Sequence, residues 1–142
     1  MARIVVGVDG SEHAVRALRW AVEEARLRDA ELVLVHVATR PSPSPPTPAP
    51  PGEAEAELAR LSRELVIDEA LSAVRTEGLT VERIALLGHP AQELVAAAEG
   101  ADLLVVGARG LGGFRGLLLG SVTQHVLAAA VSPVAVIVPE ER

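Results

Sequence analysis

The sequence predicts an α/β fold in which a five-stranded parallel sheet carries helices on both faces. Short apolar runs alternate along the chain with longer segments of helical periodicity, as is typical of right-handed strand–helix–strand units. The strand-like runs are almost continuously apolar, as expected for strands buried on both faces. A chain of 142 residues is long enough for one domain with its own core, so we expect a single domain over residues 1–142.

The five expected strands are short runs rich in valine, leucine and isoleucine. Glu82 and Arg83 interrupt the third run, which favours a place at the edge of the sheet. The last run is wholly apolar and lies between two prolines. The expected strands cover residues 4–8, 32–37, 81–87, 103–106 and 133–139.

Three of the four expected helices are marked by their ends and by one apolar face. Ser11 is placed to cap the first helix. Pro90 suits the first turn of the third helix, which we expect to end at Gly100. The last helix is expected over 121–131. The apolar face of the first helix consists of Ala14, Leu18, Ala21, Val22 and Ala25.

The second helix is expected over 53–77, and its apolar residues do not form one continuous face. One stripe consists of Leu58, Leu61 and Leu65, and a second stripe is offset around the helix. Two arrangements are consistent with this offset: a bend near Val66, or first turns that pack on something other than the sheet. Gly78 is a natural C-cap. The second stripe consists of Ile67, Ala70, Leu71 and Val74.

A proline-rich segment at 39–52 separates the second strand from the second helix. Seven prolines fall between Pro41 and Pro51, which excludes a helix or a central strand. We expect an extended surface loop within the domain. The alternative is a ligand for proline-recognition modules, because 43–46 has PxxP spacing, but such spacing arises by chance in any proline-rich tract.

Composition excludes several classes of function. The chain has no cysteine and no lysine, which rules out disulfides, thiol nucleophiles, Schiff bases and a lysine-dependent P-loop. The net charge of −6 and the lack of a basic run argue against nucleic acid. The longest apolar stretch, 126–138, is too short and too interrupted to span a membrane. No signal pattern and no histidine pair with metal-ligand spacing is present, so we expect a cytoplasmic protein without a metal site.

A glycine-rich segment follows the fourth expected strand and precedes the last helix. Five of the thirteen residues in 108–120 are glycine, which lets the backbone approach an anion closely. The first N–H groups of the helix add a partial positive charge that favours phosphate. Two structural interpretations stand beside this one: the glycines shape a tight loop, and Ser121 with Gln124 forms a capping box. A capped helix can still bind phosphate, so the capping box and the phosphate-binding interpretation are compatible.

In open parallel sheets, ligands bind beyond the carboxyl ends of the strands, where the strand order reverses. If 4–8 and 103–106 are central neighbours, Asp9 faces the glycine-rich segment. Asp9 is either a functional carboxylate or a turn residue. Arg109 is the better phosphate candidate of the two loop arginines, and Arg115 is undecided between phosphate contact and solvated charge.

Gly107, Gly110, Gly120 and Ser121 have the spacing G-x2-G-x9-G-[S/T]. This pattern resembles the ATP-binding signature of the universal stress protein family, and the resemblance extends over the whole chain. It implies a Rossmann-like three-layer α/β/α fold with strand order 3-2-1-4-5, and ATP, with or without Mg²⁺, in the crevice between the first and fourth strands.

The resemblance also assigns site residues by position. Asp9 would lie near the nucleoside or its metal, the backbone around Val37 would border adenine, and Gly7 would allow close approach. The remaining residues assigned to the nucleotide are Gly107, Ala108, Arg109, Gly110, Gly113, Gly120, Ser121 and Val122.

We therefore expect an ATP-binding, regulatory stress-response module. A slow ATPase is the first alternative, although the chain shows no evident general base. A ligand-free structural dimer is the second, and the intact signature argues against it. Because 134–138 is an apolar strand expected at a sheet edge, we also predict a homodimer through antiparallel contacts of this strand, as the family resemblance suggests.

Overall fold

The computed structural model of the chain describes residues 1–39, 52–110 and 119–140. Gly113 and Arg115 lie outside these residues. The expected proline-rich loop at 39–52 also lies outside them, except for its end residues Thr39 and Gly52. Strands and helices alternate along the described chain, and the strands form one parallel sheet of order β3-β2-β1-β4-β5. The predicted fold class and strand order are confirmed. The elements are β1 (Arg3–Gly7), α1 (Glu12–Arg28), β2 (Glu31–Ala38), α2 (Glu53–Ser72), β3 (Val81–Leu87), α3 (Pro90–Ala97), β4 (Leu103–Gly107), α4 (Ser121–Ala129) and β5 (Val134–Ile137).

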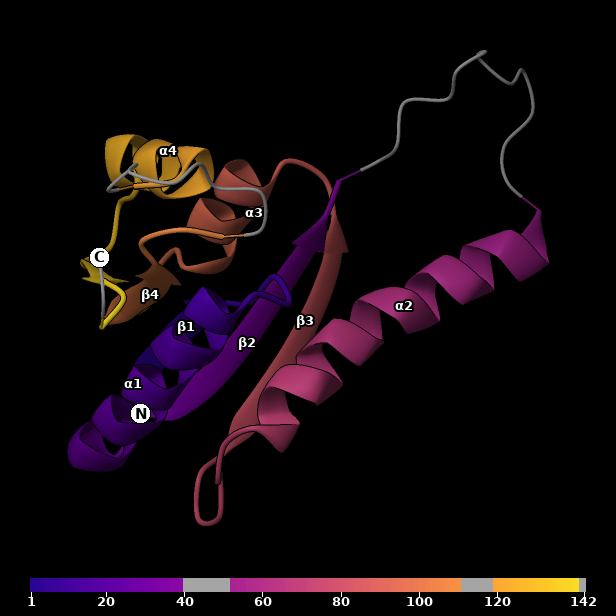
Figure 1. The fold of residues 1–142 in the computed structure, drawn as a ribbon. Helices are drawn as coiled ribbons and strands as arrows, with labels where there is room; N and C mark the ends of the chain where they lie inside the picture. Colours follow the sequence, from indigo (N-terminus) through magenta and orange to yellow (C-terminus); the bar gives the residue numbers. More distant parts are fainter. Residues whose placement is uncertain (40–51, 111–118, 141–142) are drawn as a thin grey trace.

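Helices cover both faces of the sheet, in three layers (Figure 1). Residues of α1 and α2 pack with one set of strand residues, and residues of α3 and α4 pack with the alternate set. The alternation is visible in β1, where Ile4 and Val6 belong to the first cluster and Val5 to the second. Successive strand side chains point to opposite faces, so the continuous apolar runs reflect burial on both sides.

The first helix follows the prediction closely. The Ser11 side chain accepts a hydrogen bond from the Ala14 N–H at 3.1 Å, which caps the helix as expected. Asp29 ends it in the left-handed conformation, with φ of 52°. All five residues of the predicted apolar face are buried.

The second helix ends five residues earlier than predicted, at Ser72 rather than Glu77. The Arg26 side chain donates hydrogen bonds to the carbonyl oxygens of Arg75 and Glu77, at 2.9 and 2.7 Å. These bonds hold the connection to β3 in a non-helical turn, where Gly78 takes a φ of +80°. Gly78 therefore shapes this turn and is not the helix C-cap, a position that Ala73 occupies.

The first turns of α2 continue the same helix but diverge from the sheet (Figure 1). Ile67 and Ala70 are the residues of this helix that are buried against the core, whereas residues 53–62 are all exposed. The offset stripes allowed either a bend near Val66 or first turns of the helix that do not pack on the sheet. The structure has the second arrangement. Within the described residues, no helix combines the length and apolar content needed to cross a membrane.

The last helix begins at Ser121 but not with the predicted capping box. Gly120 is the N-cap, no side chain among residues 1–39, 52–110 and 119–140 caps the helix, and Gln124 donates instead to the Leu119 carbonyl at 3.0 Å. The Gly120 N–H is bonded to the Ala108 carbonyl at 2.7 Å, which places Gly120, and not Ser121, at the cap. The capping-box prediction was wrong for this reason, and the helix ends at Ala129, two residues earlier than expected.

Candidate functional site

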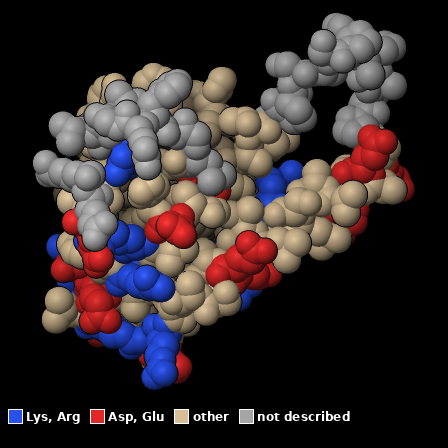
Figure 2. All heavy atoms as spheres, in the orientation of Figure 1, with Lys and Arg blue, Asp and Glu red and all other residues tan. Residues whose placement is uncertain are grey.

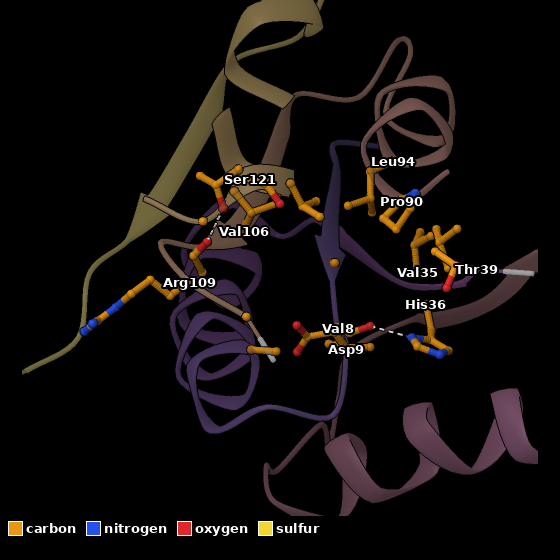
Figure 3. Close-up of a pocket in the computed structure, with 18 of the residues that line it drawn as sticks. Val8, Asp9, Val35, His36, Thr39, Pro90, Leu94, Val106, Arg109 and Ser121 are labelled. Atoms are coloured by element: carbon orange, nitrogen blue, oxygen red, sulfur yellow. Dashed lines mark hydrogen bonds between the residues drawn. The ribbon is translucent and has the colours of Figure 1, made fainter. Parts of the chain in front are cut away.

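A cavity of about 750 Å³ opens at the carboxyl ends of the central strands. The exits of β1 and β4 form its centre, and β2, α3 and the start of α4 complete the wall (Figure 3). This is the point at which the strand order reverses. From β1 the chain adds β2 and β3 on one side of the sheet, and then crosses to add β4 and β5 on the other side of β1. Ligands bind at such switch points in open parallel sheets.

Asp9 leaves β1 at the centre of the cavity wall. One carboxylate oxygen accepts a hydrogen bond from the Ser11 N–H at 2.9 Å. The other lies against Gly110, because a Cβ added to Gly110 would be 2.3 Å from Asp9 Oδ2. In Figure 3 the carboxylate points from β1 towards the β4 side of the cavity. The turn after β1 and the predicted signature, which are distant in sequence, therefore meet here, and a side chain at 110 would displace the Asp9 carboxylate.

Gly107 and Gly120 differ in how closely the rest of the chain approaches them. A Cβ on Gly107 would meet the His13 carbonyl oxygen at 3.0 Å, whereas one on Gly120 would make an ordinary contact of 3.5 Å with Arg109 Cα. Close packing therefore favours glycine at 107, while the described residues leave room for a methyl group at 120. Glycine at 120 is better explained by the approach of something outside the chain.

The N-terminus of α4 faces the cavity through Gly120, Ser121 and Val122. The first N–H groups of a helix have no partner within the helix, and no side chain of the described residues caps this one. Such groups, together with the partial positive charge of the helix end, favour an anion. The predicted phosphate-binding position is thus on the cavity wall.

Ala108 and Arg109, which lie between the first two glycines of the signature, do not direct their side-chain ends into the cavity. Ala108 is fully buried behind the wall, with its N–H on the Ile137 carbonyl at 2.9 Å and its carbonyl bonded to Gly120. Arg109 lines the cavity with part of its side chain, but its guanidinium points away from Asp9 and from the cavity in Figure 3. Its buried Nε has no hydrogen-bond partner within the described residues.

The opposite end of the cavity is apolar and suits a flat aromatic group. Val35, Val37, Pro90 and Leu94 contribute to it, whereas Val106 lies beside Ser121 (Figure 3). Gly7 is also in the wall, where an added Cβ would meet Leu94 at 3.0 Å. The backbone at Gly7 and Val37 therefore borders the space that the resemblance assigns to the nucleoside.

Sequence reasoning missed two residues that hold this wall in place. The Thr123 hydroxyl, which is buried, donates to the Gly107 carbonyl at 2.8 Å. His36 is buried at the end of β2, and its Nδ1 lies 2.8 Å from the Val8 carbonyl oxygen. Because a carbonyl only accepts, Nδ1 carries the proton in this bond. Both are polar residues within apolar surroundings, which is the signal that could have marked them.

The described residues contain no group of three histidine, aspartate or glutamate side chains able to hold a metal. Among the described lining residues, Asp9 is the one carboxylate and Arg109 the one guanidinium. The cavity thus combines an apolar end, one carboxylate and a helix N-terminus. These features define a doubly wound α/β protein with a crevice suited to a ligand that is both flat and anionic.

Comparison with known proteins gives the family. The model of the universal stress protein family matches residues 1–138, and the chain belongs to this family. A universal stress protein of Thermus aquaticus is 41% identical over 133 residues, which cover 92% of this chain and 94% of that protein. A universal stress protein of Mycolicibacterium smegmatis is 37% identical over 139 residues, but these cover 94% of this chain and 47% of the relative. The chain thus spans about half the length of several relatives.

Solved structures share the fold over nearly the whole chain. The hypothetical protein MJ0577 superposes with a TM-score of 0.77 at 27% identity, over 99% of this chain and 98% of that one. A universal stress protein of Archaeoglobus fulgidus in complex with dAMP gives 0.67 at 29% identity, over 96% and 98%. A universal stress protein in complex with cAMP gives 0.64 at 29%, over 96% and 95%.

Proposed function

We propose that this chain binds ATP in the crevice between β1 and β4 and acts in the cytoplasm as a nucleotide-dependent regulatory module of the stress response. The observation that carries the proposal is the meeting of Asp9, Gly110 and the uncapped start of α4 around one cavity. Two structural relatives that bind adenine nucleotides, dAMP and cAMP, support it.

The residues present fit such a ligand. The apolar end formed by Val35, Val37 and Leu94 would take the adenine, and Gly7 would allow it to lie close to β1. Gly120, Ser121 and Val122 would direct N–H groups to the phosphates. Arg109 would contribute a further donor if its side chain turned into the cavity. Asp9 is the residue able to contact the ribose or an accompanying Mg²⁺.

Binding fits the wall better than catalysis does. Phosphoryl transfer depends on positioned charges and on a group that orients the nucleophile. Within the described part of the cavity wall, Asp9 is the single carboxylate, and it already accepts the Ser11 N–H. We therefore propose that turnover of ATP is slow or absent, and that occupancy of the site, rather than a product, carries the signal.

We also propose that two chains pair through the edge strand β5. Its residues Val134–Ile137 are only partly buried although all are apolar, and among the described strands β5 pairs only with β4. Val138 and the nearby Leu127 and Val131 are exposed as well. An apolar edge of this kind is protected when a second copy extends the sheet. Light scattering should therefore give the mass of two chains, and Val138→Arg should shift it towards one.

Calorimetric titration of Mg²⁺-ATP tests the binding proposal. We expect one site per chain with a micromolar dissociation constant, and Gly120→Ala should weaken it about tenfold because the methyl group would stand where phosphate approaches. Gly52→Ala is the matched control, since a Cβ at 52 has no atom within 4 Å, and its affinity should not change. The proposal fails if the wild-type chain binds neither ATP, ADP nor AMP, or if Gly120→Ala binds as tightly as wild type.

A further inference from the structure

The first turns of α2 carry apolar residues on the side that faces away from the sheet. Leu58, Leu61 and Leu65 are 66%, 45% and 55% exposed, and we call these three residues the leucine stripe. Successive residues lie about 100° apart around an α-helix, so the three side chains share an arc of about 60°. Ile67 and Ala70, which pack on the sheet, lie on the opposite side of the same helix.

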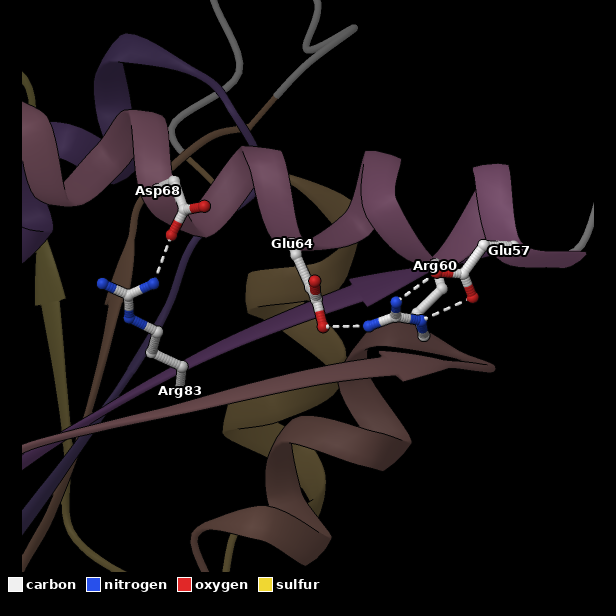
Figure 4. Close-up of polar contacts among 5 residues, drawn as sticks. All are labelled: Glu57, Arg60, Glu64, Asp68 and Arg83. Atoms are coloured by element: carbon white, nitrogen blue, oxygen red, sulfur yellow. Dashed lines mark hydrogen bonds and ion pairs between the residues drawn. The ribbon is translucent and has the colours of Figure 1, made fainter.

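Some charged side chains in this half of α2 turn towards the sheet. Arg60 and Glu64 project from the side of the helix that faces the strands (Figure 4), and Arg60 is paired there with both Glu57 and Glu64. An ordinary surface helix places its leucines inwards. This half of α2 places them outwards, so the packing of the described residues does not explain the leucine stripe.

Carboxylates border the leucine stripe along both sides. Arg60 and Arg63 fall on the sheet side by helical position, and Arg83 reaches Asp68 from β3. The outward half of the helix therefore carries no cation of its own. Figure 2 shows acidic side chains at the start of α2 and farther along it. The bordering residues, all exposed, are Glu55, Glu57, Glu64, Asp68 and Glu69. Arg60 pairs with Glu57 and Glu64, and Arg83 with Asp68, so the border carries five carboxylates against two guanidinium groups and stays acidic.

This charge pattern selects among possible occupants. A second copy placed on the same face would bring the two sets of carboxylates together, since a two-fold contact pairs a surface with itself. A bilayer with anionic lipids would be repelled in the same way. A helix whose apolar residues are flanked by lysine or arginine would satisfy both features, because leucines at i, i+3 and i+7 form the seam that a second helix packs against.

We propose that the leucine stripe of α2 is a docking surface for a basic amphipathic helix of a partner protein. The surface lies apart from the β5 edge and does not require a nucleotide. It is thus independent of the proposed function, and either could fail without the other.

The test titrates the full-length, isotope-labelled chain with a designed peptide of about three heptads, leucine at the seam and lysine beside it. A peptide of the same pattern with glutamate in place of lysine is the control. We expect amide shifts confined to α2 around 54–69, binding of the lysine peptide that weakens with salt, and none of the glutamate peptide. Equal binding of both peptides, or shifts elsewhere on the molecule, would overturn the proposal.

Variants of exposed leucines sharpen the test. Leu61→Gln should weaken the lysine peptide about tenfold, whereas Leu27→Gln, at another leucine that is 80% exposed, should not. Both variants should unfold at the wild-type urea concentration, so a loss of binding would not report a loss of folding. If Leu61→Gln instead lowers the mass by light scattering, or abolishes flotation with phosphatidylcholine vesicles, a second copy or a membrane is the occupant and the proposal is wrong.

Discussion

The crevice and the start of α2 lie in one domain but are held in different ways. In the crevice, Gly107, Gly110 and Thr123 are fixed by close backbone approaches and a buried hydrogen bond. Along residues 53–62 every side chain is exposed, and the ion pairs of Arg60 are made within the helix itself. The same kind of substitution should therefore have unequal effects in the two regions.

That difference separates residues that the fold requires from residues that it leaves free. A Cβ at Gly110 would collide with the Asp9 carboxylate, whereas the exposed leucine of position 61 could be polar without loss of packing. A single exposed apolar residue is normal, but a row of three on one side of a helix is evidence for something outside the chain. The proposed function of the crevice therefore rests on its geometry. The proposed function of the leucine stripe rests on the exposure of leucines that the packing of the described residues does not require.

The largest effect is expected for Gly110→Ala. The new Cβ would lie 2.3 Å from Asp9 Oδ2, so either the carboxylate or the loop has to move. Loss of a hydrogen bond to a charged group costs about 1.5–3 kcal/mol, which is about ten- to a hundredfold in affinity. We expect ATP affinity to fall by about ten- to a hundredfold in calorimetry, while Gly52→Ala at the start of α2 leaves it unchanged. Wild-type affinity of Gly110→Ala would show that Asp9 and the loop take no part in binding.

A smaller effect is expected for Thr123→Val. The substitution keeps the shape but removes the donor to the Gly107 carbonyl, which costs about 1–3 kcal/mol when the remaining partner is buried. Urea denaturation should show this loss. Thr80→Val, at an exposed threonine on the α2 side of the molecule, should change the free energy of unfolding by less than about 0.5 kcal/mol. Equal losses for both variants would remove the distinction between the regions.

Two serines extend the comparison to helix termini and backbone bonding. Ser11 caps α1 through the Ala14 N–H, and Ser11→Ala should cost about 1 kcal/mol. In α2 the Ser62 hydroxyl bonds back to the Leu58 carbonyl at 3.0 Å, a contact that adds little to helix stability. Ser62→Ala should therefore be neutral or slightly stabilising in the same denaturation experiment, and a loss equal to that of Ser11→Ala would contradict this.

The smallest effect concerns Glu57. Hydrogen bonds from Arg60 hold the pKa of the Glu57 carboxyl below its usual value. A lowered folded-state pKa means that the pair contributes above the pKa of the unfolded chain and that this contribution is lost as the pH falls through the folded-state pKa. Because the pair is exposed, Arg60→Gln should raise the Glu57 pKa in an NMR titration without moving the urea midpoint at neutral pH. Arg83→Gln is the control and should leave the Glu57 pKa unchanged.

Much of the fold was predictable because apolar runs and helix signals were local. The β1 and β4 runs, the Ser11 cap and the charged edge strand β3 are all visible in the sequence and confirmed in the structure. The end of α2 was not predictable, since it depends on Arg26, which is 49 and 51 residues away from its two acceptors. The cap of α4 likewise depends on a bond between Gly120 and Ala108 that spacing alone does not reveal.

The candidate site was predictable in its backbone and less so in its side chains. Glycine spacing placed Gly107, Gly110 and Gly120 on one cavity wall, and Gly107 and Gly110 mark close approaches within the chain. The direction of the Arg109 guanidinium and the supporting role of Thr123 depend on rotamers and on contacts across the sheet. A sequence pattern indicates which residues are near one another but not which way each side chain turns.

The central claim is that the crevice holds a nucleotide, and identification of small molecules released from freshly purified protein tests it most directly. The protein would be denatured and its supernatant separated by chromatography against ATP, ADP and AMP standards, followed by titration of Mg²⁺-ATP into the emptied and refolded chain. The account predicts an adenine nucleotide in the supernatant or micromolar rebinding of ATP. A chain that releases no nucleotide and binds none would contradict it and would make the glycine-lined crevice purely structural.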